Sequence, residues 1–156
     1  MIIRKCYIWD LDGTLVDSSH RAHHLQSSPI DWGAYYEKIG EDFPIMPALR
    51  LFVSCRINSG KYWDEPVQII STMRCEKYRD QTERWLMLYN MKPDHLLMQN
   101  DDDRRSAAEV KAEHLWTIRN TFNLNPILAF DDHQPVVDMY RTNGVLCYQT
   151  APSGKF

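Results

Sequence analysis

The sequence predicts an α/β fold in which a doubly wound, parallel β-sheet is covered by helices on both faces. Short apolar runs of strand length alternate with longer stretches whose apolar residues recur at helical spacing. Several of the apolar runs end in acidic or other polar residues, and ligands of such sheets bind at the carboxyl ends of the strands. At 156 residues, with 44% hydrophobic and 12% aromatic residues, the chain can bury a sizeable core.

The first predicted strand, residues 6–10, ends in an Asp-x-Asp-Gly-Thr sequence. The period of two along a strand points the side chains of Asp10 and Asp12 the same way. Two converging carboxylates repel each other, and they coexist most easily when a hard cation such as Mg²⁺ lies between them. Gly13 permits a sharp turn, and Thr14 offers backbone and hydroxyl donors to an anion. For this segment alone, an ordinary Asp-Gly turn is the alternative interpretation.

Residues 18–46 follow this strand, and we expect them to form a flap or small cap. Asp31 can cap a short helix over residues 32–39. Three aromatic residues lie on one side of this helix, namely Trp32, Tyr35 and Tyr36. Their rings either stack on a base or form the hydrophobic side of a cap helix, and the second interpretation is the commoner one for such a cluster.

The flap also carries three histidines. His20 and His24 lie one helical turn apart, as metal ligands can, and His23 lies between them. No third ligand with suitable spacing follows. We therefore prefer the interpretation that these side chains make the flap polar.

The rest of the chain alternates helices and strands. It predicts a helix at 47–57, a strand at 67–71, a helix at 76–89, a short strand at 95–98, a helix at 107–120, a strand at 126–130, a helix at 134–142 and a last strand at 145–149. Residues 58–66 predict a helix stop and a loop. The polar residues expected in one cleft at the strand ends are Asp10, Asp12, Thr72, Arg74, Asp131 and Asp132, with Lys111 reaching it from its helix.

Charge and composition exclude several classes of protein. The net charge of −3 gives no general basic field for extended nucleic-acid binding, although a few local Arg and Lys residues could hold a small substrate or one strand end. No apolar run approaches the roughly 18 residues that span a bilayer, and the N-terminus lacks a secretory signal. We therefore expect a cytoplasmic protein with no membrane partner. The four cysteines are widely spaced and predict reduced thiols.

Four segments together resemble the four motifs of the haloacid dehalogenase (HAD) superfamily. These are Asp10-Leu11-Asp12-Gly13-Thr14, Thr72 after a strand, the later Lys111, and Asp131-Asp132 after a strand. Residues 70–74, 110–116, 130–141 and 144–149 narrow the resemblance to the phosphatase domain of phage polynucleotide kinase–phosphatase. The likeness covers nearly the whole chain and implies a single HAD-like (Rossmannoid) phosphatase domain over residues 1–156, with 18–46 as the flap or small cap.

The resemblance implies a Mg²⁺-dependent phosphomonoester hydrolase that works through an aspartyl-phosphate. Asp10 would be the nucleophile, and Asp12 would protonate the leaving oxygen and then activate water. The like-charged neighbour of Asp12 should raise its pKa, which favours the acid role, while Mg²⁺ opposes this shift. Thr72 would donate to a phosphoryl oxygen, and Lys111 would offset negative charge.

The resemblance also implies ligands for the metal and the substrate. Mg²⁺ would be held by Asp10, the carbonyl of Asp12 and Asp131, with Asp132 in support. Arg74 and Arg21 are the candidates for substrate binding, because an arginine fork suits phosphate, and Gly13 and Thr14 join them. For the two arginines, solvation at the surface is the alternative.

Two features depart from the phage enzymes. They carry an acidic residue four positions before the motif lysine, where this chain has Ala107, so either Asp103 or Glu109 compensates or the lysine is held differently. A kinase P-loop is also missing, because Cys55 stands where the first glycine before Gly60-Lys61 should be. Any 5′-phosphorylation would then come from a separate protein, and a separate kinase or ligase is the implied partner.

Three functions fit the sequence. The first is removal of 3′-phosphates from polynucleotide ends, which the resemblance favours. The second is a phosphatase of free nucleotides or other small phosphomonoesters, which suits the acidic net charge. The third is a catalytically silent module that binds nucleic-acid ends in the same cleft, against which the intact acids and Lys111 argue.

Overall fold

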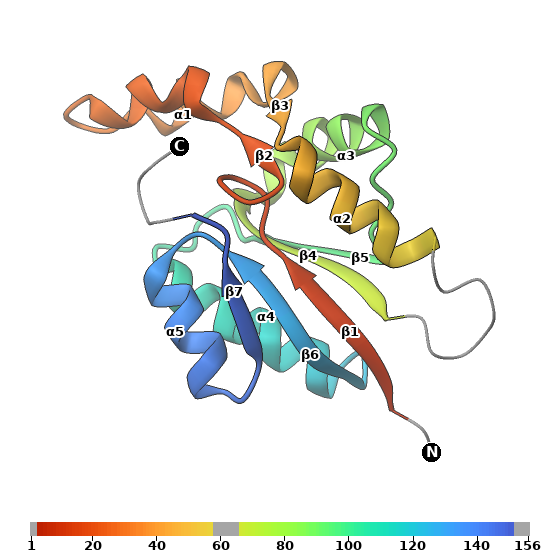
Figure 1. The fold of residues 1–156 in the computed structure, drawn as a ribbon. Coiled ribbons are helices and arrows are strands. Elements are labelled where there is room, and N and C mark those ends of the chain that lie inside the picture. Colours follow the sequence, from red (N-terminus) through yellow and green to blue (C-terminus); the bar gives the residue numbers. More distant parts are fainter. Residues whose placement is uncertain (1–2, 58–65, 152–156) are drawn as a thin grey trace.

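The computed structural model describes residues 3–57 and 66–151. Its main sheet has five parallel strands in the order β5-β4-β1-β6-β7 (Figure 1). The strands are β1 (Arg4–Trp9), β4 (Val67–Cys75), β5 (His95–Gln99), β6 (Leu124–Asp131) and β7 (Leu146–Gln149). The predicted doubly wound α/β fold is confirmed. The predicted helix stop at 58–60 and all but the last residue of the loop at 61–66 lie outside the described residues.

Helices cover both faces of this sheet. On one face lie α4 (Ala107–Asn120) and α5 (Gln134–Thr142), whose bounds are those predicted from the sequence. On the other face lie α2 (Met46–Ile57) and α3 (Arg79–Leu88), the latter preceded by the 3₁₀ turn η3 (Glu76–Tyr78). None of the described helices combines the length and the apolar character needed to cross a membrane.

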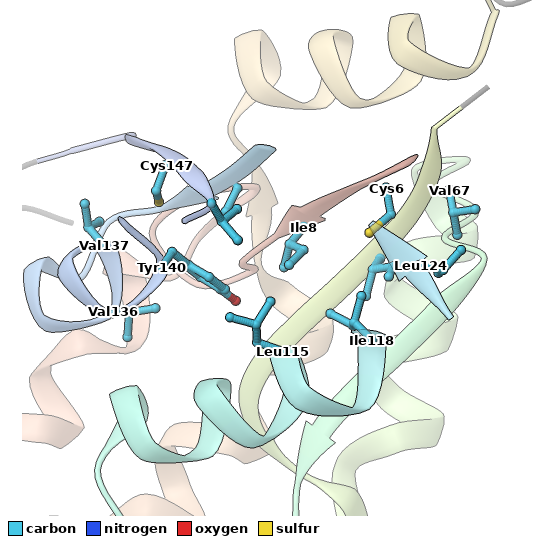
Figure 2. Close-up of a cluster of buried hydrophobic side chains, with 13 residues drawn as sticks. Cys6, Ile8, Val67, Leu115, Ile118, Leu124, Val136, Val137, Tyr140 and Cys147 are labelled. Atoms are coloured by element: carbon cyan, nitrogen blue, oxygen red, sulfur yellow. The ribbon is translucent and has the colours of Figure 1, made fainter. Parts of the chain in front are cut away.

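Side chains that point alternately to the two faces of the central strands form one hydrophobic core on each face of the sheet. In β1, Ile8 packs with α4 and α5, whereas Trp9 packs with Phe52 and Trp85 on the opposite face (Figure 2 shows the first core). Neighbouring residues of a strand point to opposite faces, so a strand covered on both sides reads as a continuous apolar run. The four cysteines are unpaired, as predicted.

The flap, residues 18–46, extends over the carboxyl ends of the strands. Two short strands, β2 (Val16–Asp17) and β3 (Phe43–Pro44), pair antiparallel at its base. Between them lie η1 (Ser19–Gln26), α1 (Trp32–Glu37) and η2 (Ile39–Glu41). Asp31 caps α1 by accepting a hydrogen bond from Ala34, and the single helix predicted over 32–39 is split into α1 and η2.

The aromatic residues of α1 mainly form a small core within the flap. Tyr35 and Tyr36 are buried and cluster with Ile39, which agrees with the interpretation of this helix as hydrophobic cap. Trp32 is 51% exposed beside them, so it alone of the three offers a ring to solvent.

A buried histidine links helix α4 to strands β4 and β5. His114 is 8% exposed, its Nδ1 lies 2.9 Å from the hydroxyl of Ser71, and its Nε2 lies 3.2 Å from the carbonyl of Met98. Burial lowers its pKa from 6.5 to about 4, so the ring is neutral at physiological pH. The contact ties the strand that carries Thr72 to the helix that carries Lys111.

The lowered pKa of His114 predicts that the protein loses stability in acid. Between pH 6.5 and 4 the unfolded chain binds a proton at His114, whereas the folded chain does not. The free energy of unfolding therefore falls as the pH drops. The expected contribution is about 3 kcal/mol over this range. Urea unfolding of wild type and His114→Gln measures it, with exposed His23→Gln as control. The same pH slope in His114→Gln and in wild type would refute the assignment.

Candidate active site

Six of the predicted site residues line one cavity of about 250 Å³ at the carboxyl ends of β1, β4 and β6. They are Asp10, Asp12, Thr72, Lys111, Asp131 and Asp132, and the other lining residues are Met73, Ala107, His133 and Val136. The strands deliver their side chains to this edge because parallel strands all end there. The helix α4 adds Lys111 from one turn inside its capped start at Ser106.

A buried ion cluster forms the floor of the cavity. The ammonium of Lys111 lies 2.6 Å from Asp10 Oδ1 and 2.7 Å from Asp131 Oδ2, and all three residues are at most 6% exposed. Burial would lower the pKa of Lys111, but Asp10 and Asp131 outweigh it and keep the ammonium charged. Burial raises the pKa of Asp10, and Lys111 opposes this rise.

The same contacts show how the lysine is held when Ala107 replaces an acidic residue. Asp103 pairs with Arg105, and Glu109 completes the capping box of α4 with Ser106. Neither therefore compensates, and Lys111 is held directly by two cavity aspartates. Ala107 itself lines the cavity, where its small side chain leaves room.

Three carboxylates in the cavity could hold a metal ion. Asp10, Asp131 and Asp132 each offer an oxygen, and these oxygens lie within 4.8 Å of one another. Burial, followed by repulsion from Asp131, raises the pKa of Asp132, and Lys111 opposes this rise. Hard oxygen ligands of this kind suit Mg²⁺, so the residues fit the predicted metal.

Gly13 allows the two acid-bearing loops to meet. Its φ is +87°, a conformation that favours glycine, and an added Cβ would lie only 2.6 Å from Asp132 Oδ2. The backbone N–H groups of Gly13 and Thr14 donate to the carbonyls of Val16 and Leu11. These donors shape the loop itself, so the contacts do not support the expectation that they bind an anion.

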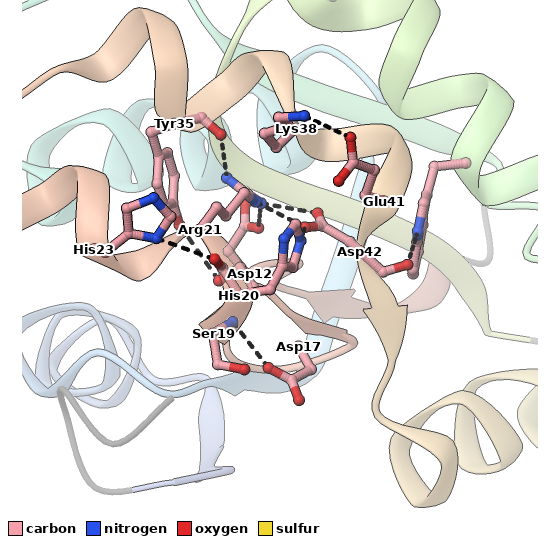
Figure 3. A network of polar contacts seen from close by, with 12 residues as sticks. Asp12, Asp17, Ser19, His20, Arg21, His23, Tyr35, Lys38, Glu41 and Asp42 are labelled. Carbon is pink, nitrogen blue, oxygen red and sulfur yellow. Dashed lines mark hydrogen bonds and ion pairs between the residues drawn. The ribbon is translucent and has the colours of Figure 1, made fainter.

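Asp12 also belongs to a charge box of two acids and two arginines, namely Asp12, Asp42, Arg21 and Arg74 (Figure 3 labels the first three). Arg74 holds it through two hydrogen bonds of 2.8 Å, and Arg21 donates to Oδ1. Asp42, which is 2% exposed, binds the same two guanidinium groups. Asp42 accepts from Arg21 Nε at 2.7 Å and from Arg74 Nη2 at 2.8 Å, and His20 Nε2 lies 2.9 Å from it.

These arginines reverse the expected titration of Asp12. Burial alone would raise its pKa, but Arg74 and then Arg21 lower it to about 2. The prediction of a raised pKa was wrong, because it considered the neighbouring acid and not two cations that are distant in the sequence. Asp12 is therefore ionised at neutral pH when the cavity holds no substrate.

Arg21 and Arg74 do not line the cavity in which the sequence places them as substrate-binding residues. Both are 0% exposed, so neither is solvated at the surface, and their guanidinium groups bind Asp12 and Asp42 rather than facing the cavity. One atom, Arg74 Nη1, is buried without a hydrogen-bond partner among the described residues. Thr72 is 1% exposed, lines the cavity, and accepts a hydrogen bond from the backbone N–H of Arg74 at 3.2 Å.

One of the three flap histidines, His20, contacts this charge box. His20 contacts Asp42, whereas the rings of His23 and His24 contact each other at an angle of 39°, with centroids 4.0 Å apart. Over the described ranges, the three cavity aspartates are the one group of ligand-type side chains close enough for a metal. The metal interpretation of the histidines is thus unsupported.

Sequence reasoning missed Asp42. It lies just after η2 and before the short strand β3, in a stretch that reads as an ordinary turn. Its partners lie 21 and 32 positions away in the sequence, so no local pattern could have identified it.

Comparisons with known proteins agree with this geometry. The sequence profile described as "Polynucleotide kinase PNKP phosphatase domain" matches residues 4–156. No curated protein sequence is significantly similar to the chain. Among solved structures, a chain of the Pnkp1/Rnl/Hen1 RNA repair complex matches with a TM-score of 0.76 and 27% identity over 99% of this chain and 44% of its own length.

Two bacterial hydrolases share the fold at lower identity. A haloacid dehalogenase-like hydrolase from Streptococcus pneumoniae matches with a TM-score of 0.64 and 14% identity, over 96% of this chain and 88% of its own. A HAD-superfamily hydrolase from Geobacter sulfurreducens matches with a TM-score of 0.56 and 14% identity over the same shares. The chain spans less than half of the repair-complex protein that it matches. By the match of the profile to nearly all its residues, the chain belongs to the family of polynucleotide kinase PNKP phosphatase domains and is a HAD-type phosphatase.

Proposed function

We propose that this phosphatase removes 3′-phosphates from polynucleotide ends, with Mg²⁺ as cofactor and an aspartyl-phosphate on Asp10 as intermediate. The observation that carries the proposal is the buried cluster in which Lys111 holds Asp10 beside Asp131, with Asp132 completing a carboxylate triad. Such a cluster combines a nucleophile, a fixed cation and a metal site at one point.

The nucleophile is the carboxylate of Asp10. Lys111 fixes its orientation, and an attack on phosphorus requires the ionised form, which the ammonium favours against burial. Asp10, Asp131 and Asp132 would hold Mg²⁺, which would supply positive charge for the phosphoryl oxygens and for the crowded acids. Thr72, which also lines the cavity, donates a hydrogen bond from its hydroxyl to a phosphoryl oxygen.

Asp12 moves the proton, under the control of its arginines. In the free protein Arg74 and Arg21 keep it ionised, which is the form that can accept a proton from water in the second step. A phosphate dianion in the cavity that Asp12 lines opposes the two arginines by its negative charge and raises the pKa of that carboxyl. Substrate binding and protonation of Asp12 are therefore coupled, and the proton is then available to the leaving oxygen.

The preference for polynucleotide ends rests on the family and on the flap. The chain resembles a protein of an RNA repair complex over 99% of its own length. Residues 18–46 form a small cap built of short elements, and such a cap leaves the cavity accessible to a strand end. A separate ligase or kinase would then act on the dephosphorylated end.

One observation favours a second candidate, a phosphatase of free nucleotides. Apart from Lys111, no Lys or Arg lines the cavity among the described residues, and the net charge is −3. A long anionic strand gains little from such a surface.

A substrate panel separates these candidates. Phosphate release is measured from 3′-phosphorylated and 5′-phosphorylated oligonucleotides of DNA and RNA and from nucleoside monophosphates, each with Mg²⁺ and with a chelator. The proposal expects the highest kcat/KM on 3′-phosphorylated ends and no release under chelation. Faster turnover of free nucleotides would establish the second candidate, and oligonucleotide binding without release from any substrate would point to a silent end-binding module.

A further prediction concerns Asp42, which belongs to the charge box. Asp42→Asn removes the charge that orients Arg21 and Arg74 while keeping the size of the side chain, so kcat should fall about 10- to 100-fold with a smaller change in KM. Steady-state kinetics test this, with Glu41→Gln, an exposed neighbour, as control. Unchanged kcat in a folded Asp42→Asn protein would show that the box has no part in the reaction.

A further inference from the structure

We propose that Gln149 and Thr150, at the carboxyl end of β7, position the two acid-bearing loops and thereby determine the affinity of the metal site. The inference builds on the proposed function, because it assumes that the carboxylate triad binds a divalent cation. Neither residue lines the cavity, so both are positioning residues and touch no reacting atom.

The first loop that they hold carries Asp131 and Asp132. The side-chain amide of Gln149 donates to the carbonyl of Asp132 at 2.9 Å. The next residue, Thr150, donates its backbone N–H to the carbonyl of Asp131 at 3.1 Å. Gln149 also pairs with Asp131 in the register of the sheet, so β7 fixes both main-chain carbonyls of this loop.

The second loop follows Asp10 and includes Gly13 and Thr14. The hydroxyl of Thr150 lies 3.0 Å from the hydroxyl of Thr14 and 3.4 Å from the carbonyl of Gly13, to which it can donate. Thr14 is 1% exposed, so its hydroxyl has little access to water as an alternative partner. One dipeptide therefore bridges the loop after β1 and the loop after β6.

The bridge lies where the two loops are already closest. Gly13 approaches Asp132 so tightly that a Cβ would lie 2.6 Å from its carboxylate. The spacing between the loops sets the spacing between the carboxylates of Asp10, Asp131 and Asp132. Mg²⁺ requires near-octahedral geometry with ligands at about 2.0–2.1 Å, so a shift of either loop by a few tenths of an ångström weakens binding. Outer-shell partners of metal ligands have measured effects of about 10- to 100-fold on affinity.

The test measures metal binding directly and does not depend on the substrate. Mn²⁺ is titrated into wild type, Thr150→Val and Gln149→Met, with free Mn²⁺ followed by electron paramagnetic resonance. Each variant keeps the approximate size of the side chain and removes the hydrogen bonds that this side chain makes to the loops. The backbone hydrogen bond from Thr150 to Asp131 remains in both. We expect the Kd for Mn²⁺ to rise about tenfold in each variant. Two controls retain the wild-type Kd, namely Thr150→Ser, which keeps the hydroxyl, and Leu146→Thr, at an exposed position of the same strand.

The outcomes separate this inference from the proposed function. A wild-type Kd in both Thr150→Val and Gln149→Met would overturn the inference, whatever the activity of these variants. An equal rise in Thr150→Ser and Thr150→Val would also contradict it, because the serine keeps the bridge. If wild type binds Mn²⁺ but hydrolyses no phosphomonoester, the proposed function fails while the titration still tests the positioning role. Thermal unfolding without metal identifies any variant that is merely misfolded.

Discussion

Asp10→Asn is expected to lower phosphate release by about 10⁴-fold while the protein stays folded. The amide cannot attack phosphorus as the carboxylate does, and it removes the charge that Lys111 and a divalent cation would share. Asn has nearly the volume of Asp, and Lys111 keeps Asp131 as partner, so the cluster retains one ion pair. Single-turnover hydrolysis of a 3′-phosphorylated oligonucleotide measures the effect.

The control for this variant is Asp80→Asn, which changes an exposed aspartate in the first turn of α3. It should retain the wild-type rate. Activity of Asp10→Asn within a few-fold of wild type would contradict the assignment of Asp10 as nucleophile and would direct attention to a water molecule activated within the triad.

Lys111→Met is expected to lower both activity and stability. Lys111 is 2% exposed, and its loss leaves Asp10 and Asp131 buried without their cation. Breaking a buried ion pair from one side typically costs about 3–5 kcal/mol, and loss of the fixed charge should reduce kcat about 10³-fold. Mg²⁺ should restore part of the stability, because it binds the folded state and replaces some of the missing charge.

Urea unfolding with and without Mg²⁺ tests this expectation. Lys38→Met is the matched control, since Lys38 is exposed and pairs only with Glu41 at the surface among the contacts described. Stabilisation by Mg²⁺ that is no larger in Lys111→Met than in Lys38→Met would contradict the shared electrostatic role of the lysine and the metal.

The fold and the cavity floor could be predicted because their signals are local. An apolar run followed by an acid indicates a strand end, and in a parallel sheet all such ends meet, so Asp10, Thr72 and Asp131 could be placed together before any coordinates. The helices α4 and α5 have their predicted bounds, and in the structure a capping box and an early proline mark their starts.

The charge box could not be predicted, because it depends on pairs far apart in the chain. Arg21, Asp42 and Arg74 come from the flap and from β4, and their distances depend on how the flap folds over the sheet. The pKa of Asp12 follows from these pairs, so an argument from its neighbouring acid alone had the wrong sign. The contact of Thr150 with Thr14 spans 136 positions and was missed for the same reason.

The most direct test of the central claim is to trap the phosphorylated protein. Wild type is mixed in excess with an oligonucleotide that carries a radiolabelled 3′-phosphate, quenched in acid during the first turnover, and digested with a protease. We expect label on the peptide that contains Asp10, released by hydroxylamine as acyl phosphates are, and no label in Asp10→Asn. Release of labelled phosphate with no labelled peptide at any time in the first turnover would contradict it.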